Sequence, residues 1–434
     1  MLRVLLFLAV TLGCTFSAQA KDKELMVLVL IDALRPDHMG SYGYTEPTTP
    51  ELDKLAALST RYTRVYANAP WTRPSTASFL TGLNASRHRT ETSKQKLPKE
   101  ITTLAQRLKK AGWTTAGFVA NGNGGSLAKL QKGFDVFRDP TNTYTKKKRG
   151  KTYNGLPTGH FLVEKAFQWL DQDKSDKVFL FLFTVDPHDP YAAPKHLEKQ
   201  FLKGYKGKIT RSPIWEYKNN YPPERRKAIV AVYDASIRYG DEAMGRLVKG
   251  LKKRNLFEKS TMMITADHGE GMGEHGFYMH AHQFWDEVVK IPLLVKSPSF
   301  TPGKVDERLT QSLDIAKTLA ALGGASTKGM PGYHLLKEEA PHVISEYNEH
   351  GIHRQAIVGK RYKVIWQKPA DEAWYMRAAK KKEYFPSVSF GKEVVRVFDL
   401  KADPGETKDL AAQMPAEAAQ LLKTLREFVA KSDS

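Results

Sequence analysis

The chain has 434 residues, of which 41% are hydrophobic and 10% are aromatic. This composition supports a sizeable core and excludes a wholly disordered chain. The formal charge of +20 favours anionic partners, such as acidic substrates, polyanions or an anionic cell envelope. No nucleic-acid-binding module is recognisable, so we expect no nucleic-acid partner.

The first twenty residues have the pattern of a signal peptide. Arg3 supplies the positive start, Val4 to Val10 form an apolar run, and Ala18 to Ala20 form a small-x-small cleavage site. The apolar run is shorter than the roughly 20 residues that span a bilayer, although a membrane anchor or a short buried helix is the alternative. We therefore expect residues 1–20 to be removed and the protein to be exported, to the periplasm or outside the cell. Cleavage would also remove Cys14, the only cysteine, and leave a charge of +19.

Apolar runs and helical patterns then alternate along the chain. The apolar runs are Met26 to Ile31, Thr114 to Ala120, Val178 to Val185, Thr261 to Ala266 and Ile291 to Val295. The helical patterns are Pro50 to Leu58, Ile101 to Lys110, Glu224 to Lys253 and Ser312 to Leu322. Alternating strands and helices predict a mostly parallel sheet that is covered on both faces.

The pattern changes beyond about residue 340. Short strands follow one another closely, and Ala416 to Ala430 form a terminal amphipathic helix. These features predict a catalytic α/β domain over residues 21–340 and a small C-terminal subdomain with an antiparallel sheet over residues 341–434.

Carboxylates and histidines follow three of the apolar runs. They are Asp32 after the first, Asp186 and His188 after the third, and Asp267 and His268 after the fourth. In α/β sheets the ligand crevice lies beyond the carboxyl ends of the strands. A single Asp in such a place is ordinary turn chemistry, but three would crowd negative charge unless a cation neutralised it. Oxygen and imidazole ligands suit Zn, Mn or a similar divalent ion.

Residues 69–82 (APWTRPSTASFLTG) supply a candidate nucleophile. Pro74 fits the first position of a helix, and Gly82 fits its end. Thr72 then lies just before the helix N-terminus, where backbone N–H groups and the helix dipole attract an anion. A hydroxyl there that also contacts a divalent cation is easier to deprotonate. The alternative is that Thr72 only caps the helix.

These segments together resemble the sulfatase-type enzymes of the alkaline phosphatase superfamily. The matching motifs are Ile31 to Gly40 with Tyr42 to Tyr44, Thr49 to Ala56, Asp186 to Tyr191, Asp267 to His280, and Phe398 to Glu406. The resemblance implies an α/β fold. It comprises an alkaline-phosphatase-like, mostly parallel central sheet flanked by helices, and a small C-terminal α+β subdomain that contains an antiparallel sheet.

The resemblance also implies a metal centre. Asp32, Asp267 and His268 would bind a divalent ion (Ca, Mn, Mg or Zn), and Thr72 would contact the same ion. We expect one ion. A second site formed by Asp186, His188 and His282 is the alternative.

The same resemblance assigns substrate contacts around that centre. His188 and His280 would bind the transferred group or protonate the leaving oxygen, with His282 as an alternative to His280. Arg73, Asp186 and His282 are the candidate substrate-binding residues. The substrate would be an anionic ester.

The chain departs from the family at the nucleophile motif. The family pattern is Cys or Ser, any residue, Pro, any residue, Arg, whereas this chain has Thr72, Arg73, Pro74, Ser75 and Thr76. Family members oxidise the cysteine or serine to formylglycine, and threonine is not a known substrate of that modification. A threonine nucleophile forms an ordinary ester, as in phosphodiesterase and phosphotransferase relatives, so phosphate esters are favoured. Arg73 either replaces the charge of the missing arginine or points away.

Three functions are compatible with these observations. The leading one is a hydrolase that cleaves sulfate or phosphate esters with Thr72. A transferase that passes a phospho-group to an envelope acceptor is the second, although related transferases have several N-terminal membrane helices. An inactive anion-binding protein is the third, favoured by the lost arginine and opposed by the intact Asp32, Asp267 and His268.

Overall fold

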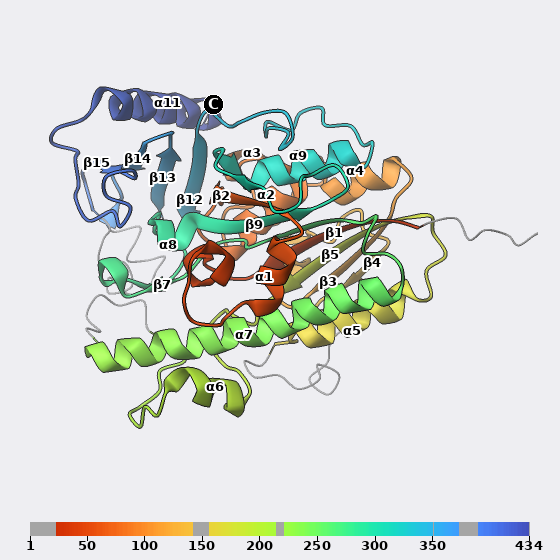
Figure 1. The fold of residues 1–434 in the computed structure, drawn as a ribbon. Helices are drawn as coiled ribbons and strands as arrows, with labels where there is room; N and C mark the ends of the chain where they lie inside the picture. Colours follow the sequence, from red (N-terminus) through yellow and green to blue (C-terminus); the bar gives the residue numbers. More distant parts are fainter. Residues whose placement is uncertain (1–22, 142–155, 214–220, 350, 373–388, 434) are drawn as a thin grey trace, which may run out of the picture.

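A nine-stranded sheet forms the centre of the protein in the computed structural model (Figure 1). The order is β10-β2-β9-β6-β1-β5-β3-β4, with β11 also paired to β2. The strands are β1 (Glu24–Ile31), β2 (Thr60–Tyr66), β3 (Thr114–Val119), β4 (Val136–Arg138), β5 (Lys177–Thr184), β6 (Thr261–Thr265), β9 (Lys290–Lys296), β10 (Val305–Asp306) and β11 (Thr310–Gln311). The structure describes residues 23–141, 156–213, 221–349, 351–372 and 389–433.

The structure bears on export and on membrane spans only within the described residues. The expected signal peptide, residues 1–20, lies outside the described residues. Within the described ranges, no helix combines the length and the apolar character needed to cross a bilayer.

The middle of the sheet is parallel. Strand β1 pairs in parallel with both β5 and β6, and β3 pairs in parallel with β5. The carboxyl ends of these four strands therefore meet at one edge of the sheet. Strand β9 is antiparallel to β6, and β2 is antiparallel to β9. The predicted mostly parallel sheet is confirmed.

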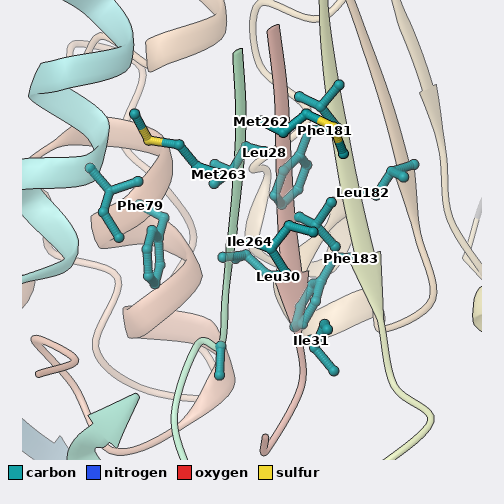
Figure 2. Packing of buried hydrophobic residues seen from close by; sticks show 14 of the residues in the cluster. Leu28, Leu30, Ile31, Phe79, Phe181, Leu182, Phe183, Met262, Met263 and Ile264 are labelled. Carbon is teal, nitrogen blue, oxygen red and sulfur yellow. The ribbon is translucent and has the colours of Figure 1, made fainter. Parts of the chain in front are cut away.

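The parallel strands are apolar because they are buried on both faces. In β1 only Glu24 is exposed, and in β5 only Lys177 is exposed. Figure 2 shows Phe181 and Phe183 of β5 beside Leu28 and Leu30 of β1. Burial of this kind contributes roughly 1.5–3 kcal/mol for each large apolar side chain.

Helices cover both faces of the sheet (Figure 1). Helices α5 and α7 lie along one face, and α2, α4 and α9 lie on the other. The helices are α1 (Pro50–Ala56), α2 (Thr72–Thr81), α3 (Ala85–His88), α4 (Leu104–Lys110), α5 (Gly159–Leu170), α6 (Lys195–Leu202), α7 (Pro223–Lys253), α8 (Asp286–Val289) and α9 (Ser312–Leu322). Short 3₁₀ turns are η1 (Pro36–His38), η2 (Gly40–Tyr42), η3 (Gly122–Gly124), η4 (Ser126–Ala128) and η6 (Glu274–Gly276).

The C-terminal part contains a second, four-stranded sheet. Its strands are β12 (Val343–Glu349), β13 (Ile352–Val358), β14 (Tyr362–Gln367) and β15 (Val394–Asp399), and every neighbouring pair is antiparallel. Helix α11 (Ala416–Asp433) packs against this sheet through apolar side chains that include Leu422 and Leu425. The predicted antiparallel sheet is confirmed, whereas the domain boundary at residue 340 stays a prediction.

A buried ion network joins the second sheet to the catalytic part. Lys363 of β14 is fully buried, and its Nζ lies 2.5 Å from Asp286 Oδ1 and 2.8 Å from Glu406 Oε1. The same Nζ donates to the Phe284 carbonyl at 3.0 Å. Asp286 begins α8, which comes directly after the loop that carries the histidines of the candidate site. The network therefore fixes the far end of that loop.

Lys363→Met is expected to destabilise the fold by about 3 kcal/mol or more, because it leaves the buried Glu406 carboxylate without its cation and removes one of the two lysines that pair with Asp286. The free energy of unfolding in urea measures the loss. Lys360→Met, at an exposed position three residues away, is the matched control and should change stability little. Equal unfolding midpoints for the two variants would show that the network contributes nothing to stability.

Candidate active site

Asp32, Asp267 and His268 lie together beyond the carboxyl ends of β1 and β6. All three side chains are fully buried, and one ligand atom from each lies within 4.8 Å of the other two. His268 Nε2 is 3.5 Å from Asp32 Oδ1 and 3.3 Å from Asp267 Oδ2. The structure thus brings together the three side chains that the sequence predicts as metal ligands.

The hydrogen bonds around this cluster leave its inner atoms available to a cation. His268 Nδ1 donates to the Gly269 carbonyl at 2.8 Å, so Nε2 carries the lone pair that faces the carboxylates. Among the described residues, Asp32 Oδ1 and Asp267 Oδ2 have no hydrogen-bond partner although both are buried. Two orphaned oxygens and an imidazole lone pair at one point fit a divalent cation.

The electrostatics of the cluster favour the same conclusion. Burial raises the pKa of Asp267 well above its usual range, and the neighbouring Asp32 raises it further. Burial also lowers the pKa of His268, with a second contribution from His280. A neutral imidazole is the form that binds a metal ion. Two adjacent buried carboxylates repel each other unless a cation lies between them.

Gly269 permits the backbone path that holds the ligands. Gly269 N donates to the Val288 carbonyl at 2.7 Å, and Glu270 N donates to the Glu287 carbonyl at 2.7 Å. A Cβ at Gly269 would lie 2.1 Å from the Glu287 carbonyl oxygen, which no side chain tolerates. The close approach of these two backbone segments therefore requires glycine at this position.

Helix α2 begins at Thr72, two residues earlier than the predicted start at Pro74. Trp71 is the N-cap, and Ser75 N closes the first turn by donating to the Trp71 carbonyl at 3.2 Å. Pro74 is accommodated because N–H groups in the first turn of a helix have no acceptor within the helix. The correction moves Thr72 from just before the helix to its first residue.

Thr72 faces the metal-ligand cluster. Its Oγ1 lies 3.3 Å from His268 Nε2, and the side chain is buried. Because Nε2 carries a lone pair, the hydroxyl donates toward it. The hydroxyl also lies at the positive end of the helix dipole, where developing negative charge is stabilised.

The rings of His280 and His188 lie next to each other beside this cluster. The His280 ring lies 4.2 Å from the His268 ring, and the His188 ring lies 5.1 Å from the His280 ring, measured between centroids. Burial alone would lower the pKa of His188, but Asp32, Asp189 and Glu270 raise it to about 9. Burial and the nearby His188 lower the pKa of His280 to about 3. The site thus places one cationic and one neutral imidazole next to the ligands.

Arg73 uses its guanidinium within the protein. Its Nη1 donates to the carbonyls of Ser93 and Gln95, and its Nη2 donates to Asn123 Oδ1 at 2.8 Å. These contacts give Arg73 a loop-binding role, and substrate binding by Arg73 stays a prediction. The sequence did not reveal this direction because a single residue type does not define a rotamer.

The other two candidate substrate-binding residues also make structural contacts. The Asp186 carboxylate accepts a hydrogen bond from Gly159 N at the start of α5, and burial raises the pKa of Asp186 to about 7. The His282 ring lies 5.3 Å from the Phe277 ring and 6.3 Å from the Tyr347 ring of β12, between centroids. This placement favours His280 over His282 beside His268.

Asn121 belongs to the site and was not identified from the sequence. It lies two residues beyond the end of β3, and its Nδ2 donates to Asp32 Oδ2 at 2.9 Å. The hydrogen bond orients Asp32 so that Oδ1 faces the other ligands. A signal was present, because Asn121 comes directly after the apolar run Thr114 to Ala120, just as Asp32 comes directly after its own run. A lone amide at a strand end is ordinary turn chemistry, however, so this signal is weak.

Asn121→Ala is expected to weaken divalent-metal affinity by about 10–100-fold, because it removes the partner that orients a ligand. Turnover at saturating metal should change much less. Titration of the metal-free protein with Mn²⁺ measures the effect. Asn123→Ala is the control, since Asn123 contacts Arg73 and not Asp32. Equal Mn²⁺ affinities for the two variants would remove Asn121 from the metal centre.

Two family profiles and a curated relative match most of the chain. The sulfatase family profile matches residues 24–325, and the profile of the N-sulphoglucosamine sulphohydrolase C-terminal region matches residues 273–433. A delta 4,5-hexuronate-2-O-sulfatase of Bacteroides thetaiotaomicron is 22% identical over an alignment of 450 residues. The alignment covers 92% of this chain and 86% of the relative.

Two solved structures share the fold over nearly the whole chain. One is a protein in complex with its substrate D-glucosamine-2-N,6-O-disulfate, with a TM-score of 0.76, 16% identity, and coverage of 94% of this chain and 98% of that one. The other is a phosphonate monoester hydrolase of Agrobacterium radiobacter, with a TM-score of 0.74, 18% identity and coverage of 94% and 96%. Because the sulfatase profile matches well over half of its length, the chain belongs to the sulfatase family, whose members hydrolyse esters with the help of a metal ion.

Proposed function

We propose that the chain hydrolyses sulfate or phosphate esters through a Thr72 nucleophile, and that phosphoesters are favoured. The observation that carries the proposal is the position of Thr72 Oγ1, 3.3 Å from His268 Nε2 at the edge of the buried carboxylates. A hydroxyl in this position lies beside the proposed metal ligands, so a bound cation would activate it as a nucleophile.

Asp32, Asp267, His268 and Thr72 would together hold one divalent ion, with Ca, Mn, Mg and Zn as the candidates. When bound, such an ion neutralises the carboxylates, lowers the pKa of the Thr72 hydroxyl and binds a substrate oxygen. The donor set of carboxylate oxygens, one imidazole nitrogen and one hydroxyl oxygen supports this proposal.

In the proposed reaction, Thr72 Oγ loses its proton and attacks the phosphorus or sulfur atom in line with the leaving oxygen. The bond to the leaving oxygen breaks as the bond to Oγ forms. When protonated, His188, whose pKa Asp189 and Glu270 help to raise, offsets the charge on the peripheral oxygens. His280, which is neutral at rest, takes up the proton that Thr72 Oγ1 releases and donates it to the leaving oxygen. Water then cleaves the threonine ester and restores the Thr72 hydroxyl.

Threonine at the nucleophile position supports phosphoester chemistry. Formylglycine arises from cysteine or serine, and residue 72 is neither. The only cysteine, Cys14, lies in the segment expected to be removed on export. A threonine ester of phosphate is cleaved by attack of water on phosphorus, without the elimination step that a formylglycine hydrate provides. Likeness to a phosphonate monoester hydrolase extends to the fold only.

Export is part of the proposal. The signal-like start and the positive charge support a periplasmic or secreted protein that meets anionic esters or the anionic envelope. Mass spectrometry of the mature protein, which should begin at Lys21, tests this step.

An activity panel tests the proposed chemistry. Aryl sulfate, phosphate monoester, phosphodiester and phosphonate esters are assayed with Ca²⁺, Mn²⁺, Mg²⁺ and Zn²⁺, and Thr72→Ala serves as the blank. We expect metal-dependent turnover of at least one phosphoester, faster than turnover of the sulfate. Turnover of the sulfate alone would contradict the phosphoester preference. Absence of any turnover together with absence of stoichiometric metal would favour an anion-binding protein.

A further inference from the structure

We propose that Glu270 is a positioning residue that fixes the His280 ring, so that His280 Nε2 is presented to the leaving oxygen. The inference rests on the proposed role of His280 in ester cleavage. The contact that carries it is a buried hydrogen bond of 3.0 Å between His280 Nδ1 and Glu270 Oε1. Glu270 is fully buried, and His280 is 7% exposed.

The backbone of Glu270 is held independently of this contact. Glu270 N donates to the Glu287 carbonyl at 2.7 Å, and the Glu270 carbonyl accepts from Arg35 Nη1 at 3.0 Å. These two contacts hold the backbone of the loop, and the Glu270 carboxylate lies beside Tyr191 as well as His280. The side chain extends from the segment that carries His268 to the ring of His280, ten residues later.

The backbone around His280 is held in an unusual conformation. Met279 and Ala281, on either side of it, both have left-handed backbones, with φ of 71° and 107°. Side chains other than glycine adopt such angles only where surrounding contacts enforce them, and these positions cluster at functional sites. One such contact is the hydrogen bond from Ala281 N to the Pro70 carbonyl at 3.0 Å, two residues before Thr72.

The hydrogen bond to Glu270 determines which ring atom can serve the reaction. With Nδ1–H donated to Glu270, only Nε2 remains for exchange with substrate. His280 is neutral at rest, and for the reaction its Nε2 takes up the proton that Thr72 Oγ1 releases. The N–H bond breaks as the new O–H bond forms on the leaving oxygen, and Nδ1–H stays with Glu270 throughout. Without the carboxylate, the His280 ring is free to rotate about its two side-chain torsions. The fraction of molecules in which Nε2 points at the leaving oxygen then falls.

The test compares esters that differ only in their leaving group. Good leaving groups such as para-nitrophenol depart without help, whereas phenol and alkyl alcohols need a proton. We expect Glu270→Gln and Glu270→Ala to change kcat for the para-nitrophenyl ester by no more than about 3-fold and to lower it about 100-fold for the poorest leaving group. Glu274→Gln is the control, because Glu274 pairs with Arg35 and not with His280.

A double-variant cycle separates positioning from a general structural role. If Glu270 acts only through His280, then Glu270→Ala combined with His280→Ala should be no slower than His280→Ala alone. Additive losses would overturn the inference. So would an unchanged leaving-group dependence in Glu270→Gln, which keeps the size of the side chain and guards against misfolding of the alanine variant.

Metal content distinguishes this inference from the proposed function. Both Glu270 variants should retain wild-type stoichiometry for Mn²⁺, since Glu270 lies outside the ligand group. Loss of the metal would make Glu270 a ligand and overturn its positioning role. Turnover by Thr72→Ala would instead overturn the proposed nucleophile and leave the contact between Glu270 and His280 to be judged by the cycle.

Discussion

Thr72→Ala is expected to lower kcat by at least about 10³-fold on every ester that the wild-type protein cleaves, since it removes the atom that forms the covalent intermediate. Metal binding should persist, because Asp32, Asp267 and His268 remain. Turnover and Mn²⁺ stoichiometry are measured on the same preparation. Loss of turnover with retained metal is the result that identifies a nucleophile.

Two further variants sharpen this result. Thr72→Ser keeps a hydroxyl at the same place and should recover much of the lost rate. Thr81→Ala removes a buried hydroxyl from the same helix, one that donates to the Ala77 carbonyl at 2.7 Å, and should leave turnover nearly unchanged. If Thr72→Ala kept wild-type turnover, water would be the nucleophile and Thr72 would only begin the helix.

The parallel centre of the fold was readable from the sequence for a physical reason. Strands β1 and β5 are buried on both faces, so they appear as uninterrupted apolar runs. Strand β2 was not predicted, because its sequence TRYTRVY mixes polar and apolar residues. The antiparallel direction of β9 could not be predicted from its apolar pattern either. Burial constrains which residues a strand contains and not the direction in which the strand runs.

The candidate site was likewise only partly predictable from the sequence. Strand ends identify Asp32, Asp267 and His268, because parallel strands bring their carboxyl ends to one edge. Side-chain directions cannot be deduced from position, and Arg73 illustrates this with its contacts to loop carbonyls. The pairing of Glu270 with His280 depends on the return of the chain between them, which no local pattern encodes.

Removal of the metal is expected to abolish turnover and to lower Tm. In the metal-free protein, Asp32 and Asp267 are buried side by side, and their mutual repulsion adds to the effect of burial in raising the pKa of Asp267. A cation that binds only the folded protein stabilises it by about 4 kcal/mol at roughly 1000 times its Kd. Dialysis against a chelator, followed by thermal unfolding with and without Mn²⁺, measures the shift.

Asp267→Asn separates the role of this carboxylate as a metal ligand from its repulsion of Asp32. It should reduce turnover by at least about 10³-fold and remove the Mn²⁺-dependent rise in Tm, because a ligand charge is lost. The metal-free variant should nevertheless unfold at a higher temperature than the metal-free wild type, since one of two repelling buried charges has gone.

Asp241→Asn provides the matched comparison at a buried carboxylate outside the site. Asp241 accepts hydrogen bonds from Glu51 N and Leu52 N at the start of α1, at 2.9 and 2.8 Å. Its loss should lower stability while leaving the Mn²⁺-dependent rise in Tm intact. A full Mn²⁺-dependent rise in Asp267→Asn would mean that the cation binds elsewhere, and the chemistry assigned to Thr72 would lose its activating ion.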